Sequence, residues 1–254
     1  MPKLKLSAPD WCFYRDTLAP ERYYTALAAL GIQGVEMVDP ARWPAARAAG
    51  LAIVNLCAPG MQQGLNSQAN HAELIPGIAQ SIALAAKEQI PAVIVFSGNR
   101  NGLSDKLGIA NCVQALRQLA PLAEKAGVQL HFEMLCAMDH ADYHADRSAF
   151  GFEVVRQVAS PAVKVLYDIY HMHRMGEDVG ADLLGHLDDI AHIHVAESPR
   201  RTVPVARGEI DYHPLVARVQ AAGYPGYWGL EFLPTRDVMT ELTEVTALFR
   251  GFAG

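Results

Sequence analysis

The chain has 254 residues, of which 51% are hydrophobic, and its formal net charge at pH 7 is −6. This length and apolar content are enough for one large core, so we expect a single domain over residues 1–254. The negative charge argues against a nucleic-acid partner. Phosphate binding needs a dense basic surface, and the densest basic cluster is the pair Arg200-Arg201.

Signals for secretion or membrane insertion are missing from the sequence pattern. Residues 1–6 lead into a strand pattern without the apolar region of a signal peptide, and the alanine-rich stretch 82–86 is too short to span a bilayer. The cysteines lack CxxC spacing, which predicts reduced thiols rather than a disulfide framework or a zinc finger. They are Cys12, Cys57, Cys112 and Cys136. We therefore expect a cytoplasmic protein without a membrane partner.

Short apolar runs alternate with segments of helical spacing along the chain. Pro20 is suited to begin the first helix and Gly31 to end it, while the continuous apolar run 91–96 predicts a strand buried on both faces. In chain order, the predicted strands cover residues 3–8, 34–38, 51–57, 91–96, 128–135, 163–167, 190–195 and 227–232. The predicted helices cover residues 20–30, 41–49, 70–89, 104–127, 149–158, 179–187, 212–222 and 238–249.

This alternation predicts the fold class. Strands that alternate regularly with helices form parallel sheets with right-handed crossovers, and eight such units in a chain of this length indicate a closed (β/α)₈ TIM barrel. A doubly wound open sheet is the structural alternative. No GxGxxG motif follows the first predicted strand, which disfavours the dinucleotide-binding version of that alternative.

Four successive predicted strands, from the fifth to the eighth, end in an ionisable side chain. These residues are Glu133, Asp168, His194 and Glu231. In a TIM barrel the carboxyl ends of the strands meet at one rim, where the chemistry is carried out. Three carboxylates gathered there would repel one another unless a cation neutralised them. We therefore predict a divalent metal site that favours Mg²⁺ or Mn²⁺, with Co²⁺ or Zn²⁺ as alternatives.

Each single residue of this set also has a structural interpretation, and Asp168 alone would serve as a helix N-cap. Strand side chains alternate between the two faces, so the residues two positions earlier should lie one level deeper in the barrel. Those residues are His131, Leu166, His192 and Gly229. We expect that His131 or His192 supports a carboxylate ligand; the alternative is a core histidine paired with backbone.

Several motifs resemble those of the hydroxypyruvate isomerase family. They are Leu166-Tyr-Asp-Ile-Tyr-His-Met172, Phe132-Glu-Met-Leu135 with Asp139-His-Ala-Asp-Tyr143 after it, and Gly229-Leu-Glu-Phe-Leu-Pro234. The family belongs to the xylose-isomerase-like barrels, together with ketose 3-epimerases, inosose dehydratases and endonuclease IV. The resemblance extends from Gly64 to Pro234, which is most of the chain.

The resemblance implies roles for individual residues. It implies metal ligation by Glu133, Asp168, His194 and Glu231, with Glu133 and Glu231 also acting as the acid/base pair. His171 would hydrogen-bond a substrate oxygen. Several hydroxypyruvate isomerases carry Gln in place of His194, whereas His is common in the ketose epimerases. In those epimerases the strand-seven loop contacts the sugar, which implies substrate contacts for Glu197 and Arg200.

The expected function is therefore a metal-dependent isomerase of a small hydroxy-keto acid, acting by enediolate proton transfer. A ketose 3-epimerase or sugar isomerase is the first alternative, and a dehydratase on the same metal is the second. An endonuclease-IV-like phosphodiesterase would need more histidine ligands and a basic groove, and a metal-binding barrel without turnover is the remaining option. The resemblance also implies a homo-oligomer.

Further residues are candidates for the pocket itself. A carboxylated substrate needs a cation, and Arg200 is favoured over the other loop arginines because it lies close to His194. The other arginines considered are Arg100, Arg201 and Arg207. The aromatic residues that follow the first strand form either a pocket wall or barrel-end packing; they are Trp11, Phe13 and Tyr14. The glycine-bearing loops 59–64 and 97–102 are candidate lids.

Overall fold

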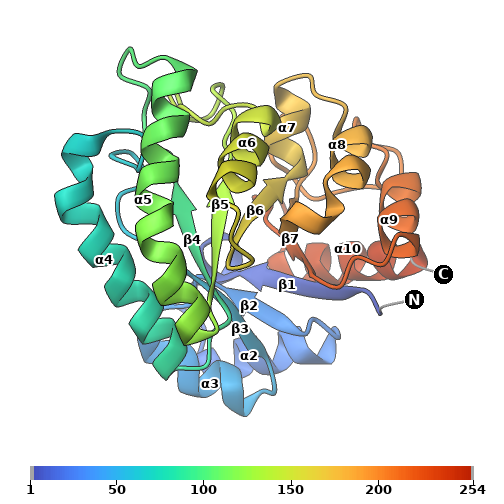
Figure 1. Ribbon diagram of the computed structural model, residues 1–254. Helices are drawn as coiled ribbons and strands as arrows, with labels where there is room; N and C mark the ends of the chain where they lie inside the picture. Colours follow the sequence, from blue (N-terminus) through green and yellow to red (C-terminus); the bar gives the residue numbers. More distant parts are fainter. Residues whose placement is uncertain (1–2, 253–254) are drawn as a thin grey trace.

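The computed structural model describes residues 3–252, and within them eight parallel strands close into a barrel with helices around it (Figure 1). Neighbouring strands follow one another in chain order, and β1 pairs with β8 through Lys5 and Tyr227 to close the ring. The strands are β1 Lys5–Pro9, β2 Gly34–Glu36, β3 Ala52–Cys57, β4 Ala92–Phe96, β5 Gln129–Glu133, β6 Val163–Asp168, β7 Ile190–Val195 and β8 Tyr227–Leu230. The closed ring confirms the TIM barrel and rules out the open sheet.

Helices follow the strands and cover the outside of the barrel, with α4 and α5 side by side over β4 and β5 (Figure 1). The α-helices are α1 Asp10–Phe13, α2 Pro20–Ala29, α3 Trp43–Ala48, α4 Gln68–Lys87, α5 Asp105–Ala126, α6 Ser148–Val158, α7 Ile169–Arg174, α8 Val179–Gly185, α9 Tyr212–Ala221 and α10 Val238–Phe252. The 3₁₀ helices are η1 Pro40–Arg42 and η2 Leu187–Asp189.

The predicted second strand is two residues too long. Met37 has a φ of +51°, which no extended strand contains, so β2 ends at Glu36 rather than at Val38. Glu36 is thereby a strand-end carboxylate as well, and its side chain is fully buried. The sequence pattern places Glu36 inside the predicted strand 34–38 and predicts no role for it.

Two short helices after β1 and β6 were not predicted. The second of these, α7, begins directly after Asp168, whose Oδ1 accepts a hydrogen bond from the backbone N–H of His171 at 3.3 Å. Asp168 is therefore an N-cap as well as a member of the strand-end set. The cap brings His171 back over the end of β6.

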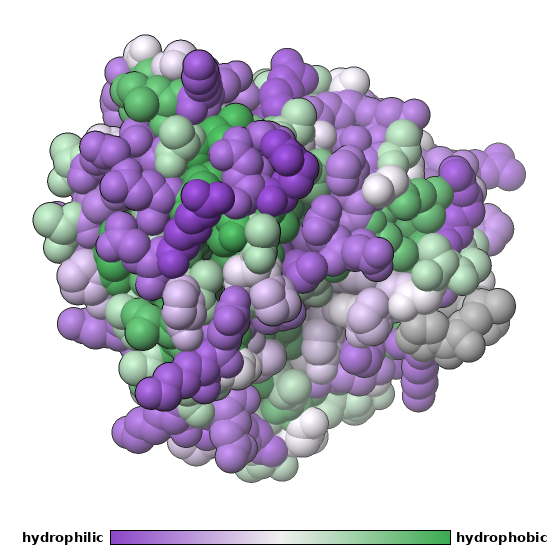
Figure 2. All heavy atoms as spheres, viewed as in Figure 1, coloured by the Kyte–Doolittle hydropathy of each residue, from purple (hydrophilic) through white to green (hydrophobic). Residues whose placement is uncertain are grey.

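The cysteines, the surface and the helix lengths can be described directly. All four cysteines are free. On the face seen in Figure 2, hydrophobic residues form separate small areas between hydrophilic ones. Among the described residues 3–252, the helices are too short or too polar to cross a bilayer.

Candidate metal centre and active site

The four predicted strand-end residues come together at the rim of the barrel. One potential ligand atom from each of Glu133, Asp168, His194 and Glu231 lies within 4.8 Å of all the others, and all four side chains are buried. The strand register produces this convergence, because Asp168 pairs with His194 across β6 and β7. Glu231 follows the end of β8 and is held to β7 by its backbone N–H, which donates to Val195 O at 3.0 Å.

Within this cluster His194 faces two carboxylates. Its Nδ1 atom lies 2.7 Å from Glu231 Oε2 and 3.6 Å from Glu133 Oε1. Burial acts to lower the pKa of His194, but the charges of Glu231 and Glu36 raise it well above its usual value. The ring therefore lies among negative charges that favour its protonated form.

The pKa values of two carboxylates in the cluster, Glu133 and Glu231, shift in opposite directions. Burial raises the pKa of Glu133, and the nearby charges of Glu231 and Asp168 add to this effect against the hydrogen bond from His194. Burial acts in the same direction on Glu231, but His194 and Arg201 overcome it and lower the pKa of Glu231. Two neighbouring carboxyl groups with separated pKa values are suited to different protonation states in one reaction.

Arg201 is the cation at this rim. Its Nη2 donates to Asp168 Oδ2 at 2.9 Å and also to Glu231 Oε2, and its Nε donates to the Glu231 carbonyl at 3.1 Å. The guanidinium lies 5.8 Å from the Trp11 ring centroid and 5.2 Å from that of Tyr170. Its backbone φ of +55° turns the chain so that this arginine points inward. The residue is 9% exposed.

His171 lies in the same network rather than free in the pocket. Its Nε2 is 2.7 Å from Arg201 Nη1, and its Nδ1 is 3.2 Å from Cys136 Sγ. Burial and the Arg201 charge lower the pKa of His171 well below its usual range, so the ring is neutral. Because arginine only donates, Nε2 must accept and Nδ1 carries the hydrogen. His171 therefore orients the guanidinium.

The structure brings Arg201, and not the predicted Arg200, into contact with the strand-end cluster. Arg200 is exposed, and its neighbour Arg201 takes the position beside the strand-end cluster. Arg207 is also exposed. Arg100 is half-buried and pairs with Asp105 instead. No pattern in the sequence separates Arg200 from Arg201, because the turn that selects one of them depends on a contact between Arg201 O and the backbone N–H of Leu233.

Glu197 is buried but points away from the cluster into its own loop. Its Oε1 accepts from the backbone N–H groups of Ser198 at 3.1 Å, Glu209 at 3.0 Å and Ile210 at 3.1 Å. This carboxylate therefore organises the loop between β7 and α9. A contact with substrate, which the resemblance implied, is not favoured by this orientation.

The aromatic residues after β1 divide between the two expected roles. Trp11 is 49% exposed and donates from Nε1 to Glu231 Oε1 at 2.9 Å, so it forms a wall of the site. Phe13 is buried and packs edge-on against Phe232 with ring centroids 4.8 Å apart. Tyr14 lies 6.4 Å from Tyr24 in a stacked arrangement and contributes to packing at the barrel end.

The two candidate lid loops are joined to each other. Gly64 has a φ of +60°, and a Cβ atom there would clash with the backbone of Ser97 and Gly98. The backbone N–H of Asn99 donates to Gln62 O at 2.8 Å, and that of Asn66 donates to Ser97 O at 2.9 Å. These hydrogen bonds and the close approach at Gly64 hold the two loops together, which disfavours their movement as independent lids.

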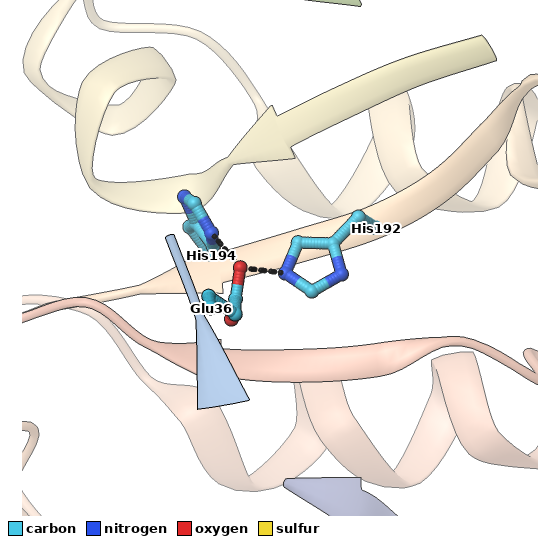
Figure 3. Close-up of side chains that lie close together, drawn as sticks. All are labelled: Glu36, His192 and His194. Atoms are coloured by element: carbon cyan, nitrogen blue, oxygen red, sulfur yellow. Dashed lines mark hydrogen bonds and ion pairs between the residues drawn. The ribbon is translucent and has the colours of Figure 1, made fainter. Parts of the chain in front are cut away.

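Beneath the rim, Glu36 lies at the centre of a second buried cluster (Figure 3). Its Oε2 is 3.0 Å from His194 Nε2 and 3.0 Å from His192 Nε2, although the His192 ring is not aligned for a hydrogen bond. Burial would raise the pKa of Glu36, but the two histidines lower it well below its usual range. His131 contacts Gln129 at 3.2 Å and lies in a stacked arrangement near His192.

The expectation for the deeper histidines is therefore corrected. His192 does meet a carboxylate, but this carboxylate is Glu36 and not one of the four predicted ligands. Glu36 could have been found by the same rule that found the others, since the Gly-Val-Glu stretch ends a predicted strand once Met37 is excluded from it.

The donor set fits a divalent cation. Three buried carboxylates and one imidazole nitrogen converge within 4.8 Å, and burial raises the pKa of both Glu133 and Asp168, as expected for negative charge that lacks a full counterion. Oxygen-rich sites with one imidazole suit Mg²⁺ and Mn²⁺, and they also accept Co²⁺ or Zn²⁺.

Comparison with known proteins agrees with this barrel fold. A family model described as the xylose isomerase-like TIM barrel matches residues 24–247, and the chain belongs to this family. A crystal structure of an AP endonuclease of family 2 from Brucella melitensis superimposes with a TM-score of 0.85. It is 20% identical and covers 95% of this chain and 97% of its own. At that identity the likeness concerns the fold alone.

Two curated relatives are hydroxypyruvate isomerases by name, which confirms the resemblance noted from the motifs. The hydroxypyruvate isomerase of Escherichia coli is 29% identical over 133 residues, and the match spans about half of each protein, 52% of this chain and 51% of that enzyme. A putative hydroxypyruvate isomerase of Homo sapiens is 25% identical over 267 residues, covering 96% of this chain and 94% of the human protein.

Proposed function

We propose that the protein is a divalent-metal-dependent isomerase of small hydroxy-keto acids of the hydroxypyruvate and tartronate semialdehyde type. The observation that carries the proposal is the convergence of three buried carboxylates and His194 with Arg201 beside them. Such carboxylates can hold a cation and move protons, and an arginine can pair with the carboxylate of an acidic substrate. The isomerase names of the relatives support the same class of reaction.

The ligands in this proposal are Glu133, Asp168, His194 and Glu231, with Mg²⁺ or Mn²⁺ as the preferred ion. A cation held there would supply Lewis-acid stabilisation of the negative charge that develops on an enediolate. Proton transfer and binding of the substrate carboxylate are assigned to side chains of the protein itself.

Glu133 is the residue that we assign to proton transfer at carbon. Its carboxylate lies at the strand-end cluster with Glu231, and a carboxylate held at hydrogen-bond reach of a substrate carbon acid can act as a general base. One proton leaves the carbon that carries the hydroxyl group and is delivered to the former carbonyl carbon, while the hydroxyl proton passes to the former carbonyl oxygen. Glu133 removes the first proton, and Glu133 or its partner Glu231 returns it.

Arg201 is the residue that we assign to the substrate carboxylate. Its guanidinium lies against the rings of Trp11 and Tyr170, which exclude water and strengthen a charge pair. His171 holds Nη1 of the same guanidinium at 2.7 Å and so keeps its orientation. Four of its five N–H groups are engaged with Asp168, Glu231 and His171. The remaining N–H and the positive charge favour an acidic substrate over a neutral ketose.

The test is a proton-exchange assay in deuterated water on the full chain, followed by proton NMR. Hydroxypyruvate, a four-carbon 2-oxo acid and a ketose are each incubated with Mg²⁺. We expect isomerisation of an acid with deuterium gained at carbon, loss of turnover after chelation with EDTA, and recovery when Mg²⁺ is added. Glu133→Gln should abolish exchange while leaving the fold intact.

Each competing function gives a different result in this assay. Turnover of the ketose with inert acids would replace the proposal by the epimerase or sugar isomerase, and loss of water would replace it by the dehydratase. If no substrate exchanges a proton although the metal binds, the barrel is a metal-binding protein without this activity.

A further inference from the structure

Glu36 is a fully buried carboxylate that lies inside the barrel directly below the proposed metal centre. Three side chains donate hydrogen bonds to it. Ser7 Oγ donates to Oε1 at 2.6 Å, and Asn55 Nδ2 donates to Oε2 at 2.6 Å. His194 Nε2 lies 3.0 Å from Oε2 (Figure 3). Gly229 leaves the necessary room, because a Cβ atom there would clash with Glu36, His192 and His194.

We infer that Glu36 is a positioning residue, which accepts the Nε2–H of His194 and thereby directs Nδ1 of that ring toward Glu133 and Glu231. A carboxylate can only accept hydrogen bonds, so the nitrogen that faces it must carry a hydrogen. Once Nε2 carries the hydrogen of a neutral ring, Nδ1 has the lone pair that a cation requires. This inference rests on the metal-dependent function proposed above.

The geometry favours this role because His194 links the two clusters. Its Nε2 faces Glu36 below, and its Nδ1 is 2.7 Å from Glu231 above. A carboxylate bonded to the far nitrogen of a metal-binding histidine fixes the ring and makes it a stronger ligand. The short β2 strand, which ends at Glu36, sets this carboxylate at the required depth.

A second metal ion held by Glu36, His192 and His194 is the competing explanation, since these residues also form a compact donor set. His194 presents Nδ1 to the rim and Nε2 to Glu36. A second ion would need a lone pair on Nε2 while Nδ1 binds the first ion, and a neutral ring has a lone pair on one nitrogen only, so we favour orientation of His194 over ligation.

The main experiment measures the affinity of the metal-free, full-length protein for Mn²⁺ by electron paramagnetic resonance, together with the number of ions bound. We expect one ion per chain, and about 10- to 100-fold weaker binding in Glu36→Gln. The matched control is His192→Gln, which removes the other ring beside the same oxygen and should change the affinity by less than about threefold. Thermal unfolding in EDTA confirms that each variant is folded.

A double variant separates positioning from a general effect on the core. If Glu36 acts through His194, then Glu36→Gln should change Mn²⁺ affinity by less than about twofold in a His194→Gln background. An equal loss in both backgrounds, an unchanged affinity in the single variant, or two ions per chain would overturn the inference.

A measurement on the unaltered protein covers the case in which Glu36→Gln does not fold. Nitrogen-15 NMR of histidine-labelled protein with Mg²⁺ or Zn²⁺ should show His194 with its hydrogen on Nε2 and the metal-dependent shift on Nδ1. The opposite tautomer would overturn the inference. Failure of the protein to bind any divalent ion would instead count against the proposed function, so the two failures are distinguishable.

Discussion

The guanidinium of Arg201 donates a hydrogen bond from Nη2 to Oδ2 of Asp168 at 2.9 Å. This contact joins the loop after β7 to the end of β6, and it brings a permanent positive charge to a rim that otherwise gathers carboxylates. The exposed neighbour Arg200 takes no part in it. Arg200 and Arg201 can therefore be compared directly by substitution, since only Arg201 makes this contact.

Replacing Arg201 by lysine should lower kcat/KM for a carboxylated substrate by about 10- to 100-fold, because a charge-assisted hydrogen bond contributes about 1.5–3 kcal/mol. Lysine keeps the charge but loses the planar fork that bonds Asp168, Glu231 and His171. Steady-state kinetics on the acid measure the effect. Arg200→Lys is the matched control and should behave as the unaltered enzyme; the reverse ranking would remove Arg201 from the site.

Trp11 should report ligand binding by fluorescence. Its Nε1 donates to Glu231 Oε1 at 2.9 Å and the indole is 49% exposed, whereas Trp43 is 6% exposed and bonded to Val38 O. Adding Mn²⁺, a paramagnetic ion, should quench part of the emission. Trp11→Phe should lose this response and Trp43→Phe should keep it. Quenching that survives in Trp11→Phe would contradict the arrangement of the rim.

His131 should make the metal-free protein sensitive to mild acid. Burial and the neighbouring His192 lower the pKa of His131 to about 3, while the unfolded chain has the ordinary value near 6.5. The unfolded state therefore takes up a proton that the folded state does not, so stability falls as the pH drops below 6.5. The expected loss from this residue is about 2 kcal/mol between about pH 7 and pH 5.

The measurement for His131 is urea unfolding across this pH range, in EDTA, for the unaltered chain and for His131→Gln. The variant has no proton to take up, so its stability should fall less steeply over the same interval. Parallel curves for the two proteins would show that His131 titrates normally in the folded state.

Gly64 should be more sensitive to substitution than Gly50, although both have a positive φ. Gly64→Ala would force a methyl group against the backbone of Ser97 and Gly98, while nothing lies within 4 Å of the corresponding position at Gly50. Gly50→Ala should cost about 1–2 kcal/mol from the backbone alone, and Gly64→Ala should cost about 1–3 kcal/mol more from the clash. Denaturant unfolding measures the stability of both variants. Equal losses of unfolding free energy would mean that the two loops are not packed against each other at Gly64.

The sequence alone determined the barrel and four residues at its rim. Apolar runs of strand length alternate with helical spacing, and this local periodicity depends on residues close together in the chain. Glu133, Asp168, His194 and Glu231 each end such a run. Because parallel strands bring their carboxyl ends to one side, the pattern was enough to predict that they converge, and the distances agree.

Only the tertiary structure decided which residues support that rim. Arg201 rather than Arg200 turns inward through a positive φ and a backbone contact with Leu233, and Glu36 reaches His194 across the barrel interior. Both choices depend on groups far apart in the chain that meet only when the ring of strands closes. Local periodicity predicts where an element ends. It does not predict which side chains of the next loop or of the opposite strand will contact that end.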